Sequence, residues 1–246
     1  AQEVIVMTYK FEYSAMARLL HMHDLTYERL NVNTDGDGRY WFTDQLLYLP
    51  AYTQHVSDMI HIVDDPKLNL IGEPRSALSK SWWEREYKHY TSVCECTGHD
   101  HKNNPVYADT AESRATLFYK AKSALYSYLR YKYKSTGAQQ KLWGCYAFMD
   151  KPLRRDGLAK SYLVFNASAM NEYGNRHILA YMVNTFMPRE VLRFYREIGY
   201  PGTDEEFALT NMLQWIWRSA IRNGKPVELY LPSARMRRIL QNWMHE

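Results

Sequence analysis

The chain has 246 residues, of which 46% are hydrophobic and 24% charged, a composition that excludes a disordered or fibrous protein. No stretch approaches the roughly 18 apolar residues of a membrane helix, the N-terminus does not resemble a signal peptide, and three Cys are too few for a disulfide framework. We therefore expect a protein inside the cell that does not use a membrane as a partner.

Basic charge is concentrated in one part of the chain. Residues 108–160 hold eleven basic and four acidic side chains, interleaved with tyrosines. This composition suits neutralisation of phosphates and stacking of bases. The alternative is a helix with a solvated basic face, because Leu117, Ala121, Leu125 and Leu129 recur at helical spacing. The candidate nucleic-acid-binding residues are Lys120, Lys122, Arg130, Lys132, Lys134, Arg154 and Arg155.

The first half of the chain begins with a predicted strand over residues 4–11, a helix over 13–23 and a polar loop over 31–45. A second strand, over 59–65, ends in Asp64 and Asp65, and Pro66 stops it. These two acids could hold Mg²⁺, but capping of the next turn is the preferred interpretation. Residues 91–110 are predicted to form another polar loop.

Strands and helices alternate in the second half. We predict a strand over 162–167, a helix over 177–187 closed by Pro188, and a helix over 189–200 with Gly199 near its end. The strongest helical pattern covers 205–225, followed by a strand over 227–232 and a last helix capped by Ser233. This alternation predicts an α/β fold with a mostly parallel sheet flanked by helices.

One constellation on the strongest predicted helix carries specific chemistry. Gln214, Arg218 and Arg222 are spaced four and four, so we expect all three side chains on one helix face. An amide and two guanidinium groups could orient and neutralise a triphosphate. The alternative is a polar stripe that simply faces water.

Long runs in the C-terminal half are similar to a known family. Residues 161–187 and 208–240 resemble the C-terminal part of the DEAD/DEAH-type (superfamily-2) helicases of bacteriophages and mobile elements, and residues 68–86 resemble a segment upstream of it. The resemblance covers about residues 67–246. It implies a RecA-like second motor lobe with ATP and Mg²⁺ shared with another lobe. It also implies a nucleic-acid strand, DNA rather than RNA, in the cytoplasm of a bacterial host.

The resemblance also implies roles for individual residues. The helix of Gln214 would correspond to motif VI, with Arg218 and Arg222 reaching ATP and one of them acting as an arginine finger. The segment after Tyr162 would correspond to motif V, with Asn166, Asn171 and Arg176 as nucleotide-binding candidates. The glycines that flank the arginines in the family are absent here, which leaves the identity of the finger open.

A phosphate-binding loop is missing from the sequence, since no G-x-x-x-x-G-K-[ST] occurs. We therefore expect no ATP hydrolysis by this chain alone, and a Walker A-bearing lobe in the same or another chain as its partner. The expected organisation is an N-terminal strand-helix portion (1–66), a basic helical insertion (67–160) and a C-terminal RecA-like portion (161–246). The alternative function is a non-catalytic nucleic-acid-binding or replication-accessory module.

Cysteine and histidine cluster in the second polar loop. Cys94, Cys96, His99 and His101 could bind Zn²⁺, which needs four such ligands. The spacing is unusual for a structural zinc site, and the alternative is a solvated loop. Cys145 has apolar neighbours and is expected to be a buried thiol.

Overall fold

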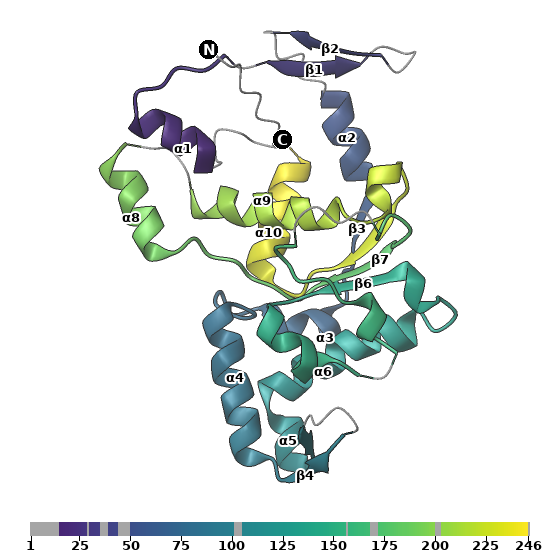
Figure 1. The fold of residues 1–246 in the computed structure, drawn as a ribbon. Coiled ribbons are helices and arrows are strands. Elements are labelled where there is room, and N and C mark those ends of the chain that lie inside the picture. Colours follow the sequence, from purple (N-terminus) through teal and green to yellow (C-terminus); the bar gives the residue numbers. More distant parts are fainter. Residues whose placement is uncertain are drawn as a thin grey trace.

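The computed structural model describes residues 15–28, 30–34, 39–43, 50–100, 105–155, 157–167, 172–199 and 203–245. The strand predicted over residues 4–11 lies outside these ranges. Two helical layers enclose one central sheet (Figure 1).

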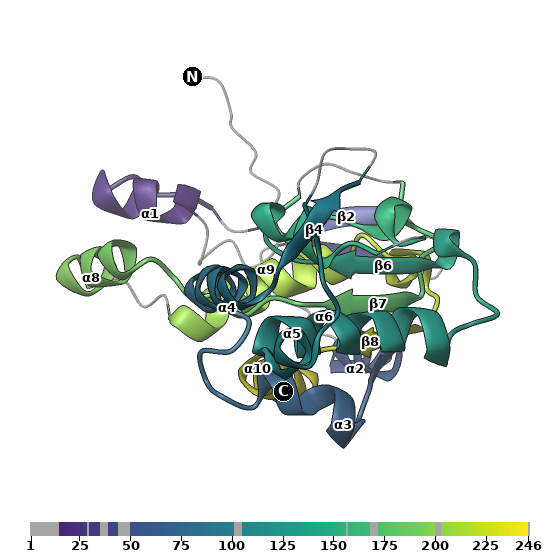
Figure 2. The same cartoon turned by 90° about the horizontal axis from the view of Figure 1, so that it is seen from below.

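The central sheet has four strands, hydrogen-bonded in the order β3 (Ile60–Ile62), β8 (Val227–Tyr230), β7 (Ile178–Tyr181) and β6 (Lys141–Gly144). Every neighbouring pair is parallel, and β6, β7 and β8 run side by side in Figure 2. This confirms the predicted α/β fold with a parallel sheet. The strands come from all three predicted portions of the chain, since β6 lies within residues 67–160.

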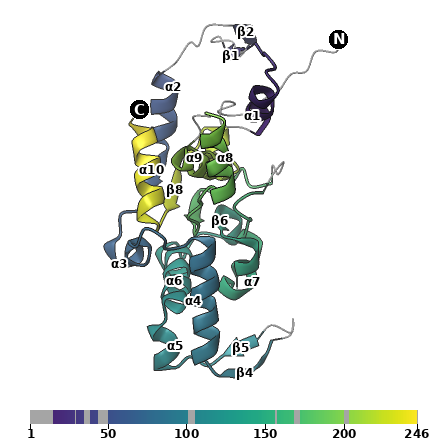
Figure 3. The same ribbon diagram turned by 90° about the vertical axis from the view of Figure 1, so that its left-hand side faces the viewer.

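Each face of the sheet is covered by its own set of helices (Figures 1 and 3). Leu142, Leu179 and Leu229 belong to the core on one face, which includes residues of α2 (Pro50–Asp58), α9 (Asp204–Ile216) and α10 (Ala234–Met244). Trp143 and Tyr230 belong to the core on the other face, with α4 (Lys80–Val93) and α6 (Leu117–Tyr126). Side chains alternate between the two faces, so the inner strand β7, whose four residues are all apolar and buried, is apolar on both faces.

The remaining elements are short or peripheral. The other helices are α1 (Ala15–Met22), α3 (Pro66–Asn69), α5 (Ala111–Ala115), α7 (Asp150–Leu153) and α8 (Arg189–Glu197). Single turns are η2 (Leu70–Gly72), η4 (Ala138–Gln140), η5 (Ala147–Met149), η6 (Ala159–Ser161), η7 (Ala220–Asn223) and η3 (Ser127–Lys132), the last being a π-helical turn. Within the described residues, every helix is too short or too polar to span a lipid bilayer.

Several predicted elements differ from the structure. The helix predicted over 177–187 is wrong, because residues 178–181 form the central strand β7, whose burial on both faces produces an uninterrupted apolar run. The two predicted loops contain antiparallel pairs, β1 (Asn31–Thr34) with β2 (Tyr40–Thr43) and β4 (Cys96–His99) with β5 (Pro105–Tyr107). The strand predicted over 162–167 is reduced to one bridge between Tyr162 and Trp143.

Predicted helix caps agree with the structure. The Ser233 hydroxyl accepts a hydrogen bond from the Met236 amide at the start of α10. Asp65 caps α3 by accepting from the amides of Lys67 and Leu68, at 3.0 and 3.3 Å. The capping interpretation of Asp65 is therefore confirmed.

Gly72 has no side chain, and this allows η2 to lie close to the loop between β8 and α10. A Cβ at residue 72 would overlap the backbone carbonyl of Pro232, which no side-chain rotation can relieve. We expect Gly72→Ala to lower the free energy of unfolding by about 1–3 kcal/mol, measured by urea denaturation. Gly137→Ala is the matched control, because a Cβ there meets no atom within 4 Å. Equal midpoints for both variants would contradict the close approach.

Candidate functional site

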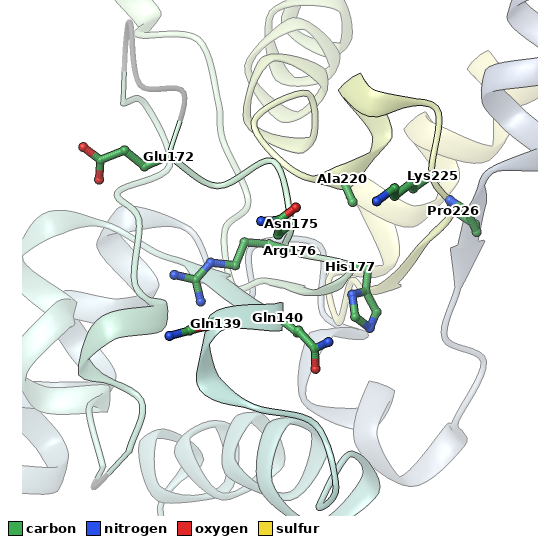
Figure 4. Close-up of a pocket in the computed structure, with 9 residues that line it drawn as sticks. All are labelled: Gln139, Gln140, Glu172, Asn175, Arg176, His177, Ala220, Lys225 and Pro226. Atoms are coloured by element: carbon green, nitrogen blue, oxygen red, sulfur yellow. The ribbon is translucent and has the colours of Figure 1, made fainter.

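A pocket of about 740 Å³ lies at the amino-terminal edge of the sheet (Figure 4). Gln140, His177 and Pro226 line it, and each directly precedes a strand, namely β6, β7 and β8. The other walls come from η7 and from residues 172–176. We call this the amino-edge pocket; its lining residues are Gln139, Gln140, Glu172, Asn175, Arg176, His177, Ala220, Lys225 and Pro226.

Arg176 fixes one wall of the amino-edge pocket. Its guanidinium donates hydrogen bonds to the backbone carbonyls of Ala138, Lys141 (3.1 Å) and Lys160 (3.3 Å), and it lies 5.6 Å from the ring centre of Tyr173. Burial lowers the pKa of Arg176, an effect that Tyr173 opposes. The guanidinium thus joins three segments of the chain, so it positions the pocket wall besides lining the pocket.

The turn η7 is tied to the same wall. The Ala220 amide donates to the Arg176 carbonyl at 2.8 Å, and the Asn223 side-chain amide donates to the Gly174 carbonyl at 3.0 Å. Gly224 ends η7 with a left-handed backbone at φ 65°, a conformation that favours glycine. Lys225, which follows this glycine, lines the pocket, whereas Arg222 of η7 is exposed and is not among the lining residues.

The amino-edge pocket is polar and its lining is cationic on balance. Arg176 and Lys225 face one carboxylate, that of Glu172, and the remaining polar lining consists of amides and His177. Guanidinium, ammonium and amide N–H groups are donors that suit an anionic or highly polar ligand. The donors of the described lining residues therefore suit binding of such a ligand.

Gln214, Arg218 and Arg222 do not share one helix face. The helix α9 ends at Ile216, Ser219 is extended at φ −89° and ψ −166°, and its hydroxyl donates to the Ile216 carbonyl at 2.6 Å. The expectation of one continuous helix is therefore wrong, because this serine competes with the helical hydrogen bonds. Gln214 is exposed on α9, whereas Arg222 is exposed on η7.

Arg218 contacts the segment that follows Tyr162. Its guanidinium donates to the Ala167 carbonyl at 3.2 Å, next to the exposed Asn166, and the indole of Trp215 donates to the Leu163 carbonyl at 3.3 Å. The two segments that resemble motifs V and VI are thus in direct contact. Asn171, the other candidate of this segment, lies outside the described residues.

The carboxyl-terminal edge of the sheet is closed by a buried polar network that the sequence analysis missed. The Arg235 guanidinium pairs with Asp204 and donates to the Asn184 side-chain oxygen and the Thr185 carbonyl, at 3.0 and 2.9 Å. Burial lowers the pKa of Arg235, and the negative charge of Asp204 opposes this shift. These residues are far apart in the sequence, because Asn184 follows β7, Asp204 begins α9 and Arg235 lies at the start of α10. No rule based on the spacing of nearby residues could therefore find them.

Asn184 extends this network into the loop before α4. Its side-chain amide donates to the carbonyls of Arg75 and Ala77, both at 2.9 Å, and its backbone amide donates to Leu78 at 3.1 Å. Leu78 is fully buried with φ 65°, a left-handed conformation that is unusual for leucine. Open parallel sheets commonly bind ligands at this edge, and here Asn184 and the loop before α4 lie beyond the carboxyl-terminal end of β7.

The predicted nucleic-acid-binding cations differ in their surroundings. The Lys122 amine donates to the Pro152 carbonyl at 2.7 Å, and burial, together with the charge of Arg155, lowers its pKa to about 8. Arg154 pairs with Asp150. Arg155 lies over the rings of Tyr126 and Tyr119, at 4.8 and 5.9 Å. Exposed cations of the set are Lys120, Arg130 and Lys134, and the side chain of Lys132 lies outside the described residues.

The predicted zinc ligands are dispersed as far as they are described. Cys94 is buried, whereas Cys96 and His99 are exposed on β4, and the Cys96 thiol donates to the Gly98 carbonyl at 3.3 Å. In the described part of the chain, no three His, Cys, Asp or Glu side chains are close enough to bind a metal. His101 lies outside that part. Cys145 is fully buried, as predicted, and burial raises the pKa of its thiol.

Comparisons with known proteins agree with the fold. A family model described as the YonV C-terminal Rossmann-like domain matches residues 54–244. The SPbeta prophage-derived uncharacterized protein YonV of Bacillus subtilis (strain 168) is 28% identical over 243 residues, covering 99% of this chain and 52% of that protein. The chain thus spans about half the length of this relative. No solved structure matches, and neither matching description names a helicase activity.

The buried ion pair at the carboxyl-terminal edge generates a prediction. Asp204→Ala leaves the Arg235 charge buried without its carboxylate, so we expect a loss of about 3 kcal/mol in the free energy of unfolding, measured by urea denaturation. Glu205→Ala removes the neighbouring acid, whose pair with Arg238 is half-exposed, and should cost less than about 1 kcal/mol. Similar losses in the two variants would show that Arg235 does not depend on Asp204.

Proposed function

Because the chain belongs to the family of YonV C-terminal Rossmann-like domains, we propose that it is the C-terminal motor lobe of an ATP-dependent helicase or translocase from a phage or mobile element. Three observations support this proposal. The chain has a parallel α/β fold, it is similar to a prophage-derived protein, and its C-terminal half resembles superfamily-2 helicases. These three observations concern the fold and the origin of the chain. The geometry of the amino-edge pocket adds an observation about the site itself.

The observation that carries the proposal is the position of the amino-edge pocket at the end of α9. Two arginines follow the last turn of this helix, Arg218 in contact with Ala167 and Arg222 exposed on η7. Ala220, at the start of η7, and Lys225, just after it, line the pocket. The pocket itself is lined by the cations Arg176 and Lys225, and cationic donors of this kind suit the charge of a triphosphate. The pocket is an incomplete nucleotide site, because the sequence has no phosphate-binding loop.

A second lobe would complete the site. That lobe, in the same or another polypeptide, carries the phosphate loop and the Mg²⁺ ligands, and the amino-edge pocket faces it across a cleft. ATP supplies a γ-phosphate on which negative charge develops during hydrolysis. Arg222 stabilises that charge when the lobes close, and Arg218 passes the movement to residues 162–167 through its bond to Ala167.

The nucleic acid would run along the exposed part of the basic segment. Arg130 within the π-helical turn and Lys134 just after it provide positive charge, and the half-buried Tyr126 carries Arg155 over its ring. Phosphate contacts of this kind are independent of sequence, which suits a protein that moves along a strand. DNA is the expected strand.

A non-catalytic nucleic-acid-binding module is the second candidate function. The observation that favours it is that Arg130 and Lys134 lie on this chain alone and need no other lobe to form a binding surface. An isolated chain that binds single-stranded DNA tightly, and whose affinity does not respond to ATP and a second lobe, would support the module over the motor.

The arginine of η7 provides the main test of the motor proposal. In the complete enzyme, with the phosphate-loop lobe present, we expect Arg222→Ala to lower the steady-state ATPase rate about 10³-fold or more, with DNA affinity changed less than about twofold. Arg193→Ala is the control, since Arg193 is an exposed arginine of α8 paired with Glu197. ATPase activity that survives Arg222→Ala would refute the finger assignment.

The exposed cations provide a separate test of nucleic-acid binding. We expect the affinity of the chain for a dT oligonucleotide to fall with salt, and each of Arg130→Ala and Lys134→Ala to reduce the slope of log K against log salt by about one. Fluorescence anisotropy at several salt concentrations measures the slopes. Lys122→Ala should leave the slope unchanged, because the Lys122 amine already bonds to Pro152 inside the protein. If neither Arg130→Ala nor Lys134→Ala changes the slope of log K against log salt, the DNA does not bind at these two cations.

A further inference from the structure

A second concave site lies far from the amino-edge pocket. It has a volume of about 610 Å³ and runs between the α3–η2 segment and α6, which lie beside one another in Figure 1. The Tyr230 hydroxyl donates to the Leu68 carbonyl at 2.6 Å, which fixes α3 at the carboxyl-terminal end of β8. We call this site the α3–α6 groove. A ligand bound there would leave the amino edge of the sheet free.

Large apolar side chains are exposed within the groove. Leu70 of η2 is 69% exposed and Leu117 at the start of α6 is 40% exposed, and both line the groove together with Ile71 and Pro74. A single exposed leucine on a surface is ordinary. Two of them on the walls of one concave site form a place where an apolar side chain of a partner would lose contact with water.

Positive charge surrounds this apolar lining. Lys67 and Lys120 are both exposed on the groove, and neither has an acidic partner in the described part of the chain. Arg114 also lines the groove, and the nearby Asp109 is held by it at 2.9 Å. The groove therefore presents two uncompensated ammonium groups, which are complementary to carboxylates.

The groove is poorly suited to stacking of bases. Its one tryptophan, Trp82, is only 3% exposed and packs edge-on against Trp83, with ring centres 4.9 Å apart. Its tyrosine, Tyr119, is faced by the Arg155 guanidinium. Nucleic acids without sequence preference bind on accessible aromatic faces, whereas leucine walls suit apolar side chains of a peptide.

We propose that the α3–α6 groove docks a short acidic peptide segment of a partner protein. One or two large apolar side chains of that segment insert between Leu70 and Leu117, and its carboxylates contact Lys67 and Lys120. Lys120 then serves a protein partner and not the nucleic acid. This inference goes beyond the proposed function and does not depend on it, because the groove lies away from the amino-edge pocket.

The test uses two labelled peptides and the whole chain. The anchored peptide, Asp-Asp-Glu-Leu-Phe-Asp-Asp, carries acids around two apolar residues, and the control peptide has Ser in place of both Leu and Phe. Fluorescence anisotropy should show at least tenfold tighter binding of the anchored peptide. Equal binding of the two peptides would mean attraction of charge alone, and no binding of the anchored peptide below about 1 mM would mean no such site. Either result would overturn the proposal.

Variants of the chain locate the binding. We expect Lys120→Glu and Leu70→Ser each to weaken binding of the anchored peptide at least tenfold, with urea midpoints unchanged because both side chains are exposed. Lys88→Glu is the matched control, an exposed lysine of α4 outside the groove, and should change binding less than twofold. An unlabelled dT oligonucleotide should not displace the peptide. If the oligonucleotide displaces the peptide from the unchanged chain, and Leu70→Ser abolishes DNA binding, then the groove is a nucleic-acid site. That result would overturn the peptide assignment.

Discussion

A single buried guanidinium, that of Arg235, determines how the helices meet the sheet. It joins Asn184 after β7, Asp204 at the start of α9 and the start of α10 itself. Because the amino end of α9 is held there, its other end emerges at the opposite edge of the sheet, where Arg218 and η7 follow. The geometry of the candidate nucleotide site thus depends on a polar network at the far end of the same helix.

The two edges of the sheet consequently differ in what they offer a ligand. At the carboxyl-terminal edge, Asn184 satisfies the carbonyls of the loop before α4, and the left-handed Leu78 fits against it. At the amino-terminal edge, loops held by Arg176 leave an open polar pocket. A buried charge requires partners that remain in place, whereas the amino-terminal edge places the cation Lys225 on an open pocket.

The sequence was sufficient for the fold class but not for every element. Caps such as Ser233 and Asp65 are local signals, and the structure agrees with them. Residues 178–181 were misassigned because a strand buried on both faces has no polar positions that would reveal its period. The end of α9 was missed because Ser219 differs from a helical serine only in its backbone angles, which the residue type does not determine. Likewise, charge alone could not reveal that Lys122 bonds to Pro152 inside the protein.

The strand order also has a consequence for synthesis on the ribosome. The two outer strands, β3 and β6, leave the ribosome first, and the two inner ones, β7 and β8, follow later. Among the described strands, β3 pairs with β8 alone, so its backbone groups remain without a sheet partner until residues 227–230 have been translated. Pairing between such distant segments is slow and exposes apolar surface in the meantime. The sheet of the nascent polypeptide therefore depends on β8, and translation that stops before residue 227 would leave a product that cannot complete this sheet.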